Sequence, residues 1–549
     1  MTLINPLHRI NPAKLIKPAI LMTTLFLCCH CALLPSTRTW DAGRQAMADA
    51  PEILRRAVAA AGTHEANGTG NLTVTYPYDG AVFPPDIASP AFLWTEKAHR
   101  SDRWLVRLAF AGKRDPVYAL TREPRWTPSP ELWERIIQEG IRAGGLENTI
   151  HISVFGLADA SPVRVTDTHA SAFSVSRDPV NAAIFYRQVP LPFLATPEGF
   201  KRTRWRLGDI SSYEPPKTVM TDIPVCASCH TFSQDGRRMS MEMNRNNDGG
   251  AQFITPVKKQ MVLKEGDFMS WSDFPRSGVL PPTRGLFGRM SPSGDYLAAS
   301  VNEISYAAVL DAIDFSQLFF PTYGVLGYYS AATDKIQLLP GADDRAYVHA
   351  NPVWSPDEQY IVFARAATKN EVHADITHVV PHRPGGTIHD LNKKYQIQFD
   401  LYRIPFNNGR GGTPEPLQGA SNNGMSNYFA RYSPDGKWIV FTRSRSGIML
   451  QPDSELYIIP ADGGKARRMN CNRCLFNSWH SWSPNGKWLL FTSKVNTPYT
   501  EIFLTHIDEN GNDAPPVLLS RFSDDAFAAN VPAFTPFGAD AIDSIRLAK

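Results

Sequence analysis

Five consecutive residues, Cys226-Ala227-Ser228-Cys229-His230, have the types and spacing needed to hold a redox cofactor. The pattern C-x-x-C-H is the attachment signature of a c-type haem. Two thiols three positions apart can add to the vinyl groups of a porphyrin, and the adjoining imidazole can then ligate the iron. The motif predicts one covalent haem c, bound through Cys226 and Cys229 with His230 as proximal ligand. The alternative is a disulfide or half of a zinc site that precedes a histidine by chance.

The second axial ligand decides what such an iron can do. Methionine or histidine there suits electron transfer, whereas an open position permits small-ligand binding or peroxidase-like turnover. The following strand offers Met243 and Met241 as candidate distal ligands, and His349 is a third candidate. Antiparallel pairing about the turn predicts position 232 opposite 239 and position 230 opposite 241, so Met241 would point the same way as His230. Alternate apolar residues on a strand are also ordinary core residues, which is the competing interpretation of each methionine.

A second cysteine pair, Cys471 and Cys474, has the same spacing but is followed by Leu475. Without a histidine it cannot be a second haem site of the usual kind. In an oxidising compartment the pair predicts a short disulfide, and a metal site that adds His480 is the alternative. A run of four histidines between positions 373 and 389 lies in a predicted loop, where a solvated insertion is favoured over a transition-metal site.

Other chemistry is sparse in this sequence. It has no G-x-S-x-G, H-E-x-x-H or phosphate-cradling glycine loop, so hydrolase and nucleotide-binding functions have no support. The formal net charge is +3, from 56 basic and 53 acidic residues that are mixed along the chain. This mixture predicts no nucleic-acid partner and no polybasic membrane surface. An electron carrier or binding protein is therefore favoured over an enzyme.

The first segment has the composition of a targeting element. Arg9, Lys14 and Lys17 form a positive flank, and residues 19–34 are almost entirely apolar. This stretch is shorter than the roughly 20 residues that span a bilayer comfortably. Residues 1–35 are therefore predicted to be either a cleaved signal peptide or a retained N-terminal anchor. Both place the remainder in the periplasm or cell envelope, with membrane contact only through an anchor.

The length of 549 residues is too great for one hydrophobic core, so we expect more than one domain. Residues 36–70 are polar and alanine-rich and are predicted to be a linker with a short helix over 51–61. Residues 71–195 contain short runs of alternating apolar and polar residues, which predict half-buried strands. The stretch that begins at Tyr76-Pro77 resembles the opening of a fibronectin-III or Ig-like β-sandwich.

A repeated hairpin sequence organises the chain from about residue 200 to 549. Tyr432-Ser433-Pro434-Asp435-Gly436 and Trp482-Ser483-Pro484-Asn485-Gly486 are clear copies, and further copies start at 232, 290, 354 and 534. An aromatic residue ends one strand, Ser-Pro-Asp-Gly makes a tight turn, and an apolar strand returns. One such unit cannot bury both of its faces, so six copies predict a ring of six blades.

These repeats resemble the TolB-like six-bladed propellers built from Pro-Asp-type WD40-like repeats, in a bacterial subset that carries one C-x-x-C-H motif. The stretches 399–412, 477–482 and 504–508 share the resemblance. It covers residues 200–549 well and the β-sandwich loosely. It implies an all-β protein, with an N-terminal β-sandwich followed by a six-bladed TolB-like β-propeller, and an exported haem protein rather than any particular reaction.

One haem iron carries one electron, so the sequence favours an exported c-type cytochrome that passes single electrons to a redox protein partner. Two alternatives stay open. One is a TolB-like interaction scaffold with a cell-envelope partner, in which the haem is structural or redox-sensing. The other is a haem peroxidase or oxidase with an open iron site. The position of His230 on the strand that enters the first turn predicts a haem at one mouth of the propeller channel or against the inner edge of the first blade.

Overall fold

The structure is a computed structural model, and its described part lies within the unit Thr37–Lys549. The residues it describes are 38–41, 51–62, 68–110, 115–143, 149–192, 197–223, 225, 227–278, 280–310, 312–368 and 386–548. The predicted signal peptide or anchor at 1–35 thus lies outside the described residues. Every helix within them is too short or too polar to traverse a bilayer.

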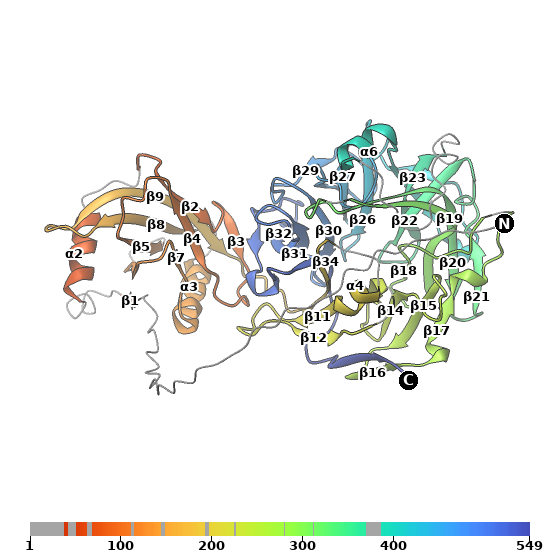
Figure 1. Ribbon diagram of the computed structural model, residues 1–549, viewed down its shortest axis with the longest axis horizontal. Helices are drawn as coiled ribbons and strands as arrows, with labels where there is room; N and C mark the ends of the chain where they lie inside the picture. The colour runs from red at the N-terminus through yellow and green to blue at the C-terminus, as the bar shows by residue number, and fades with distance from the viewer. Residues whose placement is uncertain are drawn as a thin grey trace, which may run out of the picture. The chain divides into compact units, whose positions relative to one another are not determined.

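Most described strands form six four-stranded antiparallel sheets, which are the blades of a β-propeller (Figure 1). The predicted all-β fold and the ring of six blades are confirmed. From the innermost strand outward, the first three blades are β13 (Ala227–Phe232), β14 (Arg238–Met243), β15 (Ala251–Pro256) and β17 (Phe268–Ser270); β18 (Arg289–Met290), β19 (Tyr296–Val309), β20 (Gln317–Ser330) and β21 (Lys335–Leu338); and β22 (Tyr347–Trp354), β23 (Tyr360–Ala367), β24 (Asp400–Pro405) and β25 (Glu415–Pro416). The other three are β26 (Ser426–Tyr432), β27 (Trp438–Ser444), β28 (Glu455–Pro460) and β29 (Arg467–Arg468); β30 (Asn477–Trp482), β31 (Trp488–Ser493), β32 (Glu501–His506) and β33 (Val517–Leu518); and β34 (Phe527–Phe534), β10 (Ile184–Pro190), β11 (Arg204–Gly208) and β12 (Lys217–Met220).

The repeated turns are fixed by local side-chain hydrogen bonds. In the fourth blade the Ser433 hydroxyl donates to Asp435 at 2.5 Å and accepts the backbone N–H of Trp438 at 3.0 Å. Gly436 follows with φ of 72°, in the left-handed region that glycine adopts without strain. The same hydroxyl contact recurs from Ser233 to Asp235, from Ser355 to Asp357 and from Ser483 to Asn485. Each of these four turns therefore specifies its hairpin through contacts within the turn.

The ring is closed by strands from two distant parts of the chain. β34 supplies the innermost strand of the sixth blade, and β10, β11 and β12 supply the other three. β10 pairs with β34 in an antiparallel register that begins at Ile184 opposite Phe534. The predicted domain boundaries, with the sandwich at 71–195, are therefore corrected, because Ile184–Pro190 belongs to the propeller. A second contact joins distant parts of the chain, because β16 (Gln260–Leu263) pairs in parallel with the C-terminal β35 (Ser544–Leu547).

A two-sheet β-sandwich precedes the ring, as the alternating strands predict. Helix α3 (Pro130–Ala143) places Trp133, Ile136 and Ile137 in the sandwich core. In order across the larger sheet, the strands are β1 (Arg38–Asp41), β6 (Val117–Thr121), β5 (Arg103–Phe110), β8 (Thr149–Ala158), β9 (Arg164–Val175) and β3 (Ala81–Phe83). The smaller sheet consists of β2 (Leu72–Tyr76), β4 (Phe92–Glu96) and β7 (Arg125–Trp126).

The segment 36–70 is not simply the linker that its composition predicts. Helix α2 (Glu52–Ala61) matches the predicted helix, but its Leu54 is buried in a cluster with Leu105 and Phe155 of the larger sheet. β1 pairs with β6 at the edge of the same sheet. The described part of this segment therefore belongs to the sandwich, because the helix has one apolar face that needs burial.

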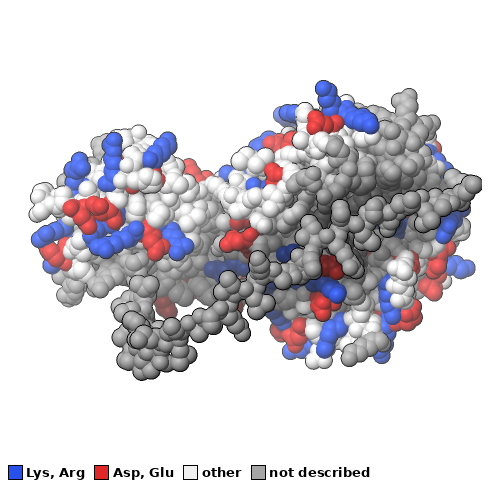
Figure 2. All heavy atoms as spheres, viewed as in Figure 1, with Lys and Arg blue, Asp and Glu red and all other residues white. Residues whose placement is uncertain are grey.

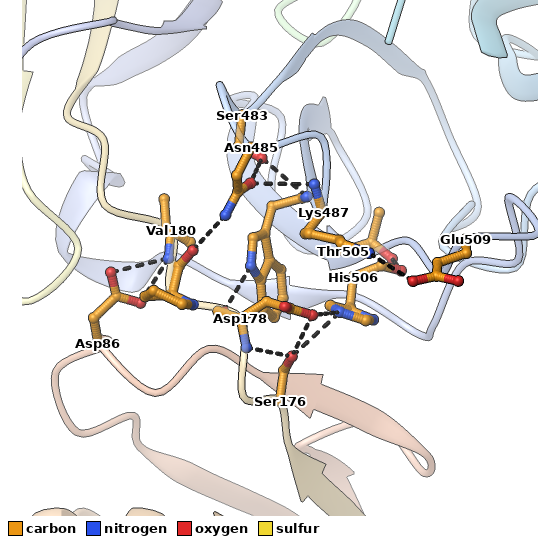
Figure 3. A network of polar contacts seen from close by, with 12 residues as sticks. Asp86, Ser176, Asp178, Val180, Ser483, Asn485, Lys487, Thr505, His506 and Glu509 are labelled. Carbon is orange, nitrogen blue, oxygen red and sulfur yellow. Dashed lines mark hydrogen bonds and ion pairs between the residues drawn. The ribbon is translucent and has the colours of Figure 1, made fainter. Parts of the chain in front are cut away.

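Polar contacts join the sandwich to the fifth blade (Figure 3). The Trp488 indole donates to the Asp178 carbonyl at 3.0 Å, and the His506 ring lies edge-on to the indole with centroids 4.8 Å apart. The Asp178 carboxylate contacts His506 Nε2 at 3.0 Å. The amide of Asn485 donates to the Pro179 carbonyl at 2.7 Å. The turn and outer strands of this blade thus form the docking surface for the sandwich.

On the face shown in Figure 2, acidic and basic side chains of the described residues are interspersed.

Truncation of Trp488 tests this contact, because the fourth blade carries a matched residue. Trp438 occupies the same repeat position, but its ring packs on the Arg467 guanidinium, 5.4 Å from the centroid. Trp488→Ala should lower the free energy of unfolding by about 3–5 kcal/mol, because a fully buried aromatic side chain is lost. Trp438→Ala should cost clearly less. Urea unfolding followed by circular dichroism measures both variants, and equal losses would contradict a stabilising role for the sandwich contact.

Candidate functional site

The mouth of the propeller channel is a cavity of about 320 Å³. Each repeated turn begins with a serine or threonine, and equivalent positions before this residue line the cavity in every blade. These turn residues are Ser233, Ser291, Ser355, Ser433, Ser483 and Thr535. We call the residue two before this hydroxyl the rim position. The rim residues, in blade order, are Thr231, Arg289, Val353, Arg431, Ser481 and Ala533. Above them the mouth is lined by aromatic residues and by the turn prolines Pro292, Pro356, Pro434, Pro484 and Pro536.

A smaller chamber of about 70 Å³ adjoins the mouth and shares Arg289, Arg431 and His230 with it. The chamber is lined by residues four before the turn hydroxyl, which we call the bulge position. The bulge residues that line it are Cys229, Phe287, Phe429, Trp479 and Val531. Cys229 is therefore the first-blade member of a ring whose other members are mostly large and apolar.

Backbone bulges turn these side chains toward the chamber. Phe429 and Trp479 have φ of 52° and 50°, and the pairing of β26 and β30 shifts register at these points. The pairing of β13 shifts at the same place, between Ala227 and His230. A bulge places two residues opposite one and re-aims a side chain. The fold thus directs Cys229 into the channel.

The long hairpin of the second blade packs against aromatic residues that line the chamber. β19 and β20 have fourteen residues each, and Phe319 forms a bridge to Ile448 of the fourth blade. The ring of Phe319 lies 5.5 Å from that of Phe287, which in turn lies 5.7 Å from Phe429, both edge-on. Leu318 is buried in the same cluster as Phe429. We infer that a ligand reaches the chamber through the mouth.

His230, the predicted iron ligand, is buried beside this channel. Only 1% of its surface is exposed, and its ring lies edge-on to Phe185 of β10 with centroids 4.6 Å apart. Neither ring nitrogen makes a well-formed hydrogen bond with a described residue, although the Phe185 backbone lies near enough to oppose part of the shift in the pKa of His230. Burial, with a smaller contribution from the charge of Arg289, lowers the pKa of His230 to about 3. The imidazole is therefore neutral and its ring nitrogens are unused, which is the form that ligates a metal.

Cys229 is a free thiol that is partly exposed to the chamber. Burial, followed by the negative charge of Glu242, raises the pKa of Cys229 to about 12. It therefore stays protonated at neutral pH and is a weak nucleophile in the folded blade. Cys226, the other predicted attachment point, lies outside the described residues.

Tryptophans of neighbouring blades hold the backbones of the two rim arginines. The Trp354 indole donates to the Arg289 carbonyl at 3.0 Å, and the Trp482 indole donates to the Arg431 carbonyl at 3.2 Å. Each tryptophan ends the innermost strand of the next blade. These contacts connect the second blade to the third and the fourth to the fifth, and they fix where the two guanidinium groups enter the channel.

These arginines are held by backbone carbonyls rather than by ion pairs: the Arg289 guanidinium donates to the His230 carbonyl at 3.2 Å, and the Arg431 guanidinium donates to the Ala430 carbonyl at 2.8 Å. Among the described residues, no acidic side chain forms an ion pair with Arg289 or Arg431. Glu242 is the acidic neighbour of Arg289, but its oxygens already accept the Ser228 hydroxyl at 2.6 Å and a backbone N–H at 2.9 Å. The ionisable groups acting on Arg431 are Arg289 itself and the thiol of Cys229. An arginine does not deprotonate in a protein, so two positive charges remain in the channel.

The predicted distal methionines lie in the core rather than in the channel. Phe232 pairs with Met239 and His230 with Met241, which confirms the predicted register. Met241 and Met243 are at most 1% exposed, belong to the core between the first and sixth blades, and line neither cavity. Their alternation serves packing, as the competing interpretation of the sequence proposed.

Two further histidines differ in their relation to the channel. His349, the third candidate distal ligand, is fully buried with its ring edge-on to Phe363, 5.2 Å between centroids, and lines neither cavity. His480 occupies in the fifth blade the repeat position that His230 holds in the first, and it lines the chamber. Its Nε2 contacts the Val440 carbonyl at 2.9 Å.

The predicted Cys471–Cys474 disulfide is absent, because both residues are free thiols. Cys471 is buried in the core between the fourth and fifth blades, whereas Cys474 is exposed, so the two side chains occupy different environments. Among the described residues no three His, Cys, Asp or Glu side chains group as a metal site, and the alternative with His480 is not formed either. His373, His378 and His382 lie outside the described residues, and His389 is exposed on helix α6 (Ile388–Lys394).

The donor groups fit a c-type haem, and the space restricts where it could lie. His230 supplies a neutral imidazole with unused nitrogens, and Cys229 supplies a thiol beside it. The chamber of about 70 Å³ is too small for a porphyrin. The mouth, at about 320 Å³, lies at the lower end of cavities that bind drug-sized ligands and is lined largely by apolar rings. A haem ligated by His230 would therefore belong to the mouth, which His230 lines, whereas Cys229 lines the adjoining chamber.

Similarity to solved structures concerns the propeller. TolB from Acinetobacter baumannii is 14% identical, with a TM-score of 0.39, over 70% of this chain and 79% of that one. The putative TolB from Agrobacterium tumefaciens is 14% identical, with a TM-score of 0.34, over 64% of this chain and 99% of that one. No protein-family model and no curated protein matches the chain. Similarities of this size describe the arrangement of strands alone.

The rim arginines were not predicted from the sequence, although a signal for them exists. Once the six turns are aligned, the rim position carries arginine in the second and fourth blades and a small or apolar residue in the other four. Inner-strand positions of a propeller face a narrow channel, where a long charged side chain needs a reason. A blade-by-blade comparison of the repeat would therefore have found both arginines.

The buried His349 generates a test of pH dependence. Burial, followed by the charge of Arg365, lowers the pKa of His349 to about 3, whereas an unfolded histidine titrates near about 6.5. The unfolded chain thus binds the extra proton, and stability falls as the pH drops below about 6.5, by about 2 kcal/mol at about pH 5. His349→Phe should reduce the loss of stability between about pH 8 and about pH 5 by this amount. Urea unfolding at both pH values measures it.

The matched control is His151→Phe, which changes an exposed histidine of the sandwich. It should leave the difference between the two pH values unchanged. An unaltered difference in His349→Phe would show that this ring is protonated or solvated in the folded protein.

Proposed function

We propose that the chain is an exported c-type haem protein in which Cys226 and Cys229 hold one haem, His230 ligates its iron, and single electrons pass to a protein partner. The observation that carries the proposal is the state of His230: buried, neutral, without a well-formed hydrogen bond to a described residue at either ring nitrogen, and next to a free cysteine at a cavity. A buried polar group without a partner is destabilising, so a ligand for this imidazole explains its presence.

The chain's own residues define what the site supplies. A covalent haem would supply the one-electron chemistry. His230 stays unprotonated far below neutral pH, so its nitrogen is available over the whole physiological range. The hairpin of β19 and β20 packs in the same apolar cluster as Phe429, which lines the chamber, whereas the mouth is the larger cavity. A redox partner would therefore dock at the mouth, where the turns of all six blades meet.

Attachment would precede folding of the first blade. The pKa of Cys229 at about 12 keeps this residue as a thiol in the folded channel, and the thiolate is the reactive form. In the unfolded chain a cysteine ionises near about pH 8.5. Export in an unfolded state, as the apolar segment at 19–34 predicts, provides that opportunity outside the cytoplasm.

A second candidate function keeps the haem but leaves its second axial position open. The observation that favours it is that Met241, Met243 and His349 line neither cavity. An iron without a distal protein ligand binds small molecules and supports peroxidase-like turnover. Rapid carbon monoxide binding to the ferrous protein would favour this candidate over the electron carrier.

Haem attachment is tested by producing the chain in a host that matures c-type cytochromes. The wild type should carry one haem by intact mass, with both motif thiols blocked against alkylation. Cys226→Ser/Cys229→Ser should lose the covalent haem entirely. His230→Ala should keep the covalent mass and change the absorption spectrum, because the thioether bonds survive but the proximal ligand does not.

The matched control is Cys471→Ser/Cys474→Ser, which removes a pair of equal spacing without a following histidine. This variant should retain the haem and its spectrum. A colourless wild type whose Cys226 and Cys229 are both alkylated would contradict the proposal.

A further inference from the structure

The two rim arginines bring two positive charges to the channel, and a role of His230 as an iron ligand does not explain them. Arg289 and Arg431 come from the second and fourth blades and line both the mouth and the chamber. Both side chains retain part of their surface for a ligand, being intermediate in exposure. As no acidic side chain pairs with either in the described part of the chain, their charges repel one another across the channel.

Such an arrangement is unfavourable without an anion. Burying a charge away from water requires a compensating charge or several hydrogen bonds. The nearest described groups provide hydrogen bonds but no opposite charge, because the Arg289 guanidinium donates to the His230 carbonyl at 3.2 Å and the Arg431 guanidinium donates to the Ala430 carbonyl at 2.8 Å. Two guanidinium groups therefore line this cavity without an ion-paired acidic side chain among the described residues.

The surroundings restrict the chemistry of that anion. The planar fork of a guanidinium matches a carboxylate with two parallel hydrogen bonds. Ser481, at the same level, accepts the Phe534 N–H at 3.2 Å and keeps its own proton for another acceptor. The mouth above is lined by Trp354, Trp482 and other aromatic side chains and prolines. The rim arginines and Ser481 form a polar floor of the mouth, and the aromatic residues and prolines form its apolar wall. A molecule with a small anionic group and an apolar remainder fits this arrangement.

We propose that Arg289 and Arg431 bind a carboxylate group at the floor of the mouth and that the apolar wall of the mouth holds the body of the same molecule. Two sources offer this chemistry. One is a propionate of the attached haem, in which case the inference rests on the proposed function. The other is a free small carboxylic acid, which needs no haem.

The experiment uses the full chain purified from two hosts, one that matures c-type cytochromes and one that does not. Isothermal titration calorimetry measures benzoate, with benzamide as the uncharged probe of equal shape. The haem-free chain should bind benzoate at least about tenfold more tightly than benzamide, since charged hydrogen bonds to two arginines are gained. Arg431→Gln and Arg289→Gln should each weaken benzoate binding about tenfold or more and leave benzamide unchanged.

Two controls make the result specific. Arg445→Gln changes an arginine whose side chain is 83% exposed on the fourth blade and should not affect binding. Arg431→Lys keeps the charge but loses the fork, so it should bind benzoate with intermediate affinity. Unchanged circular dichroism of each variant excludes loss of the fold as the cause.

The two sources give different results in the haem-bearing chain. Loss of benzoate binding there identifies a propionate as the occupant, whereas retained binding identifies a free carboxylic acid. Failure of haem attachment alone leaves the arginine-dependent binding in place, so it contradicts the proposed function and not this inference. Equal affinity for benzoate and benzamide in the haem-free chain, or wild-type affinity in both glutamine variants, would overturn the inference.

Discussion

The antiparallel pairing of β34 with β10 is the constraint on which the rest of the structure depends. It makes one blade from the two ends of the propeller sequence and converts a row of hairpins into a ring. Without closure, the first and sixth blades would expose edge strands, and Phe185 of β10 would not cover the ring of His230. The burial that keeps this histidine neutral is thus a consequence of closure rather than of the local motif.

Backbone bulges then decide which residues meet in the channel. An unbroken strand would alternate its side chains between the two faces of a blade. The bulge near Cys229, like those at Phe429 and Trp479, adds one residue and turns a side chain toward the axis. The C-x-x-C-H motif coincides with this bulge, so two adjacent residues serve different purposes: Cys229 lines the chamber, while His230 packs between blades.

Much of the fold was predictable because its turns are local. Ser433, Asp435 and Gly436 specify their hairpin through contacts within a few residues, so each copy is visible in the sequence. β10, β11 and β12 have no such turn, and their place in the sixth blade follows from a partner about 340 residues away, which no local pattern encodes. For the same reason the spacing of Cys471 and Cys474 suggested a disulfide without revealing that only one of them faces the core.

The channel also shows why its polar groups could not be assigned from the sequence alone. A histidine three residues before a turn is solvated in an open hairpin and dehydrated in a closed ring, and only the ring determines which applies. Packing at the outer strands and between blades stabilises the fold, as the fully buried Trp271 and Trp488 illustrate. That stability permits unfavourable groups at the centre: imidazole nitrogens of His230 without a well-formed hydrogen bond, and two arginines without an ion pair among the described residues. Since such groups oppose folding, their concentration at one cavity is the strongest physical argument that the cavity exists to bind something.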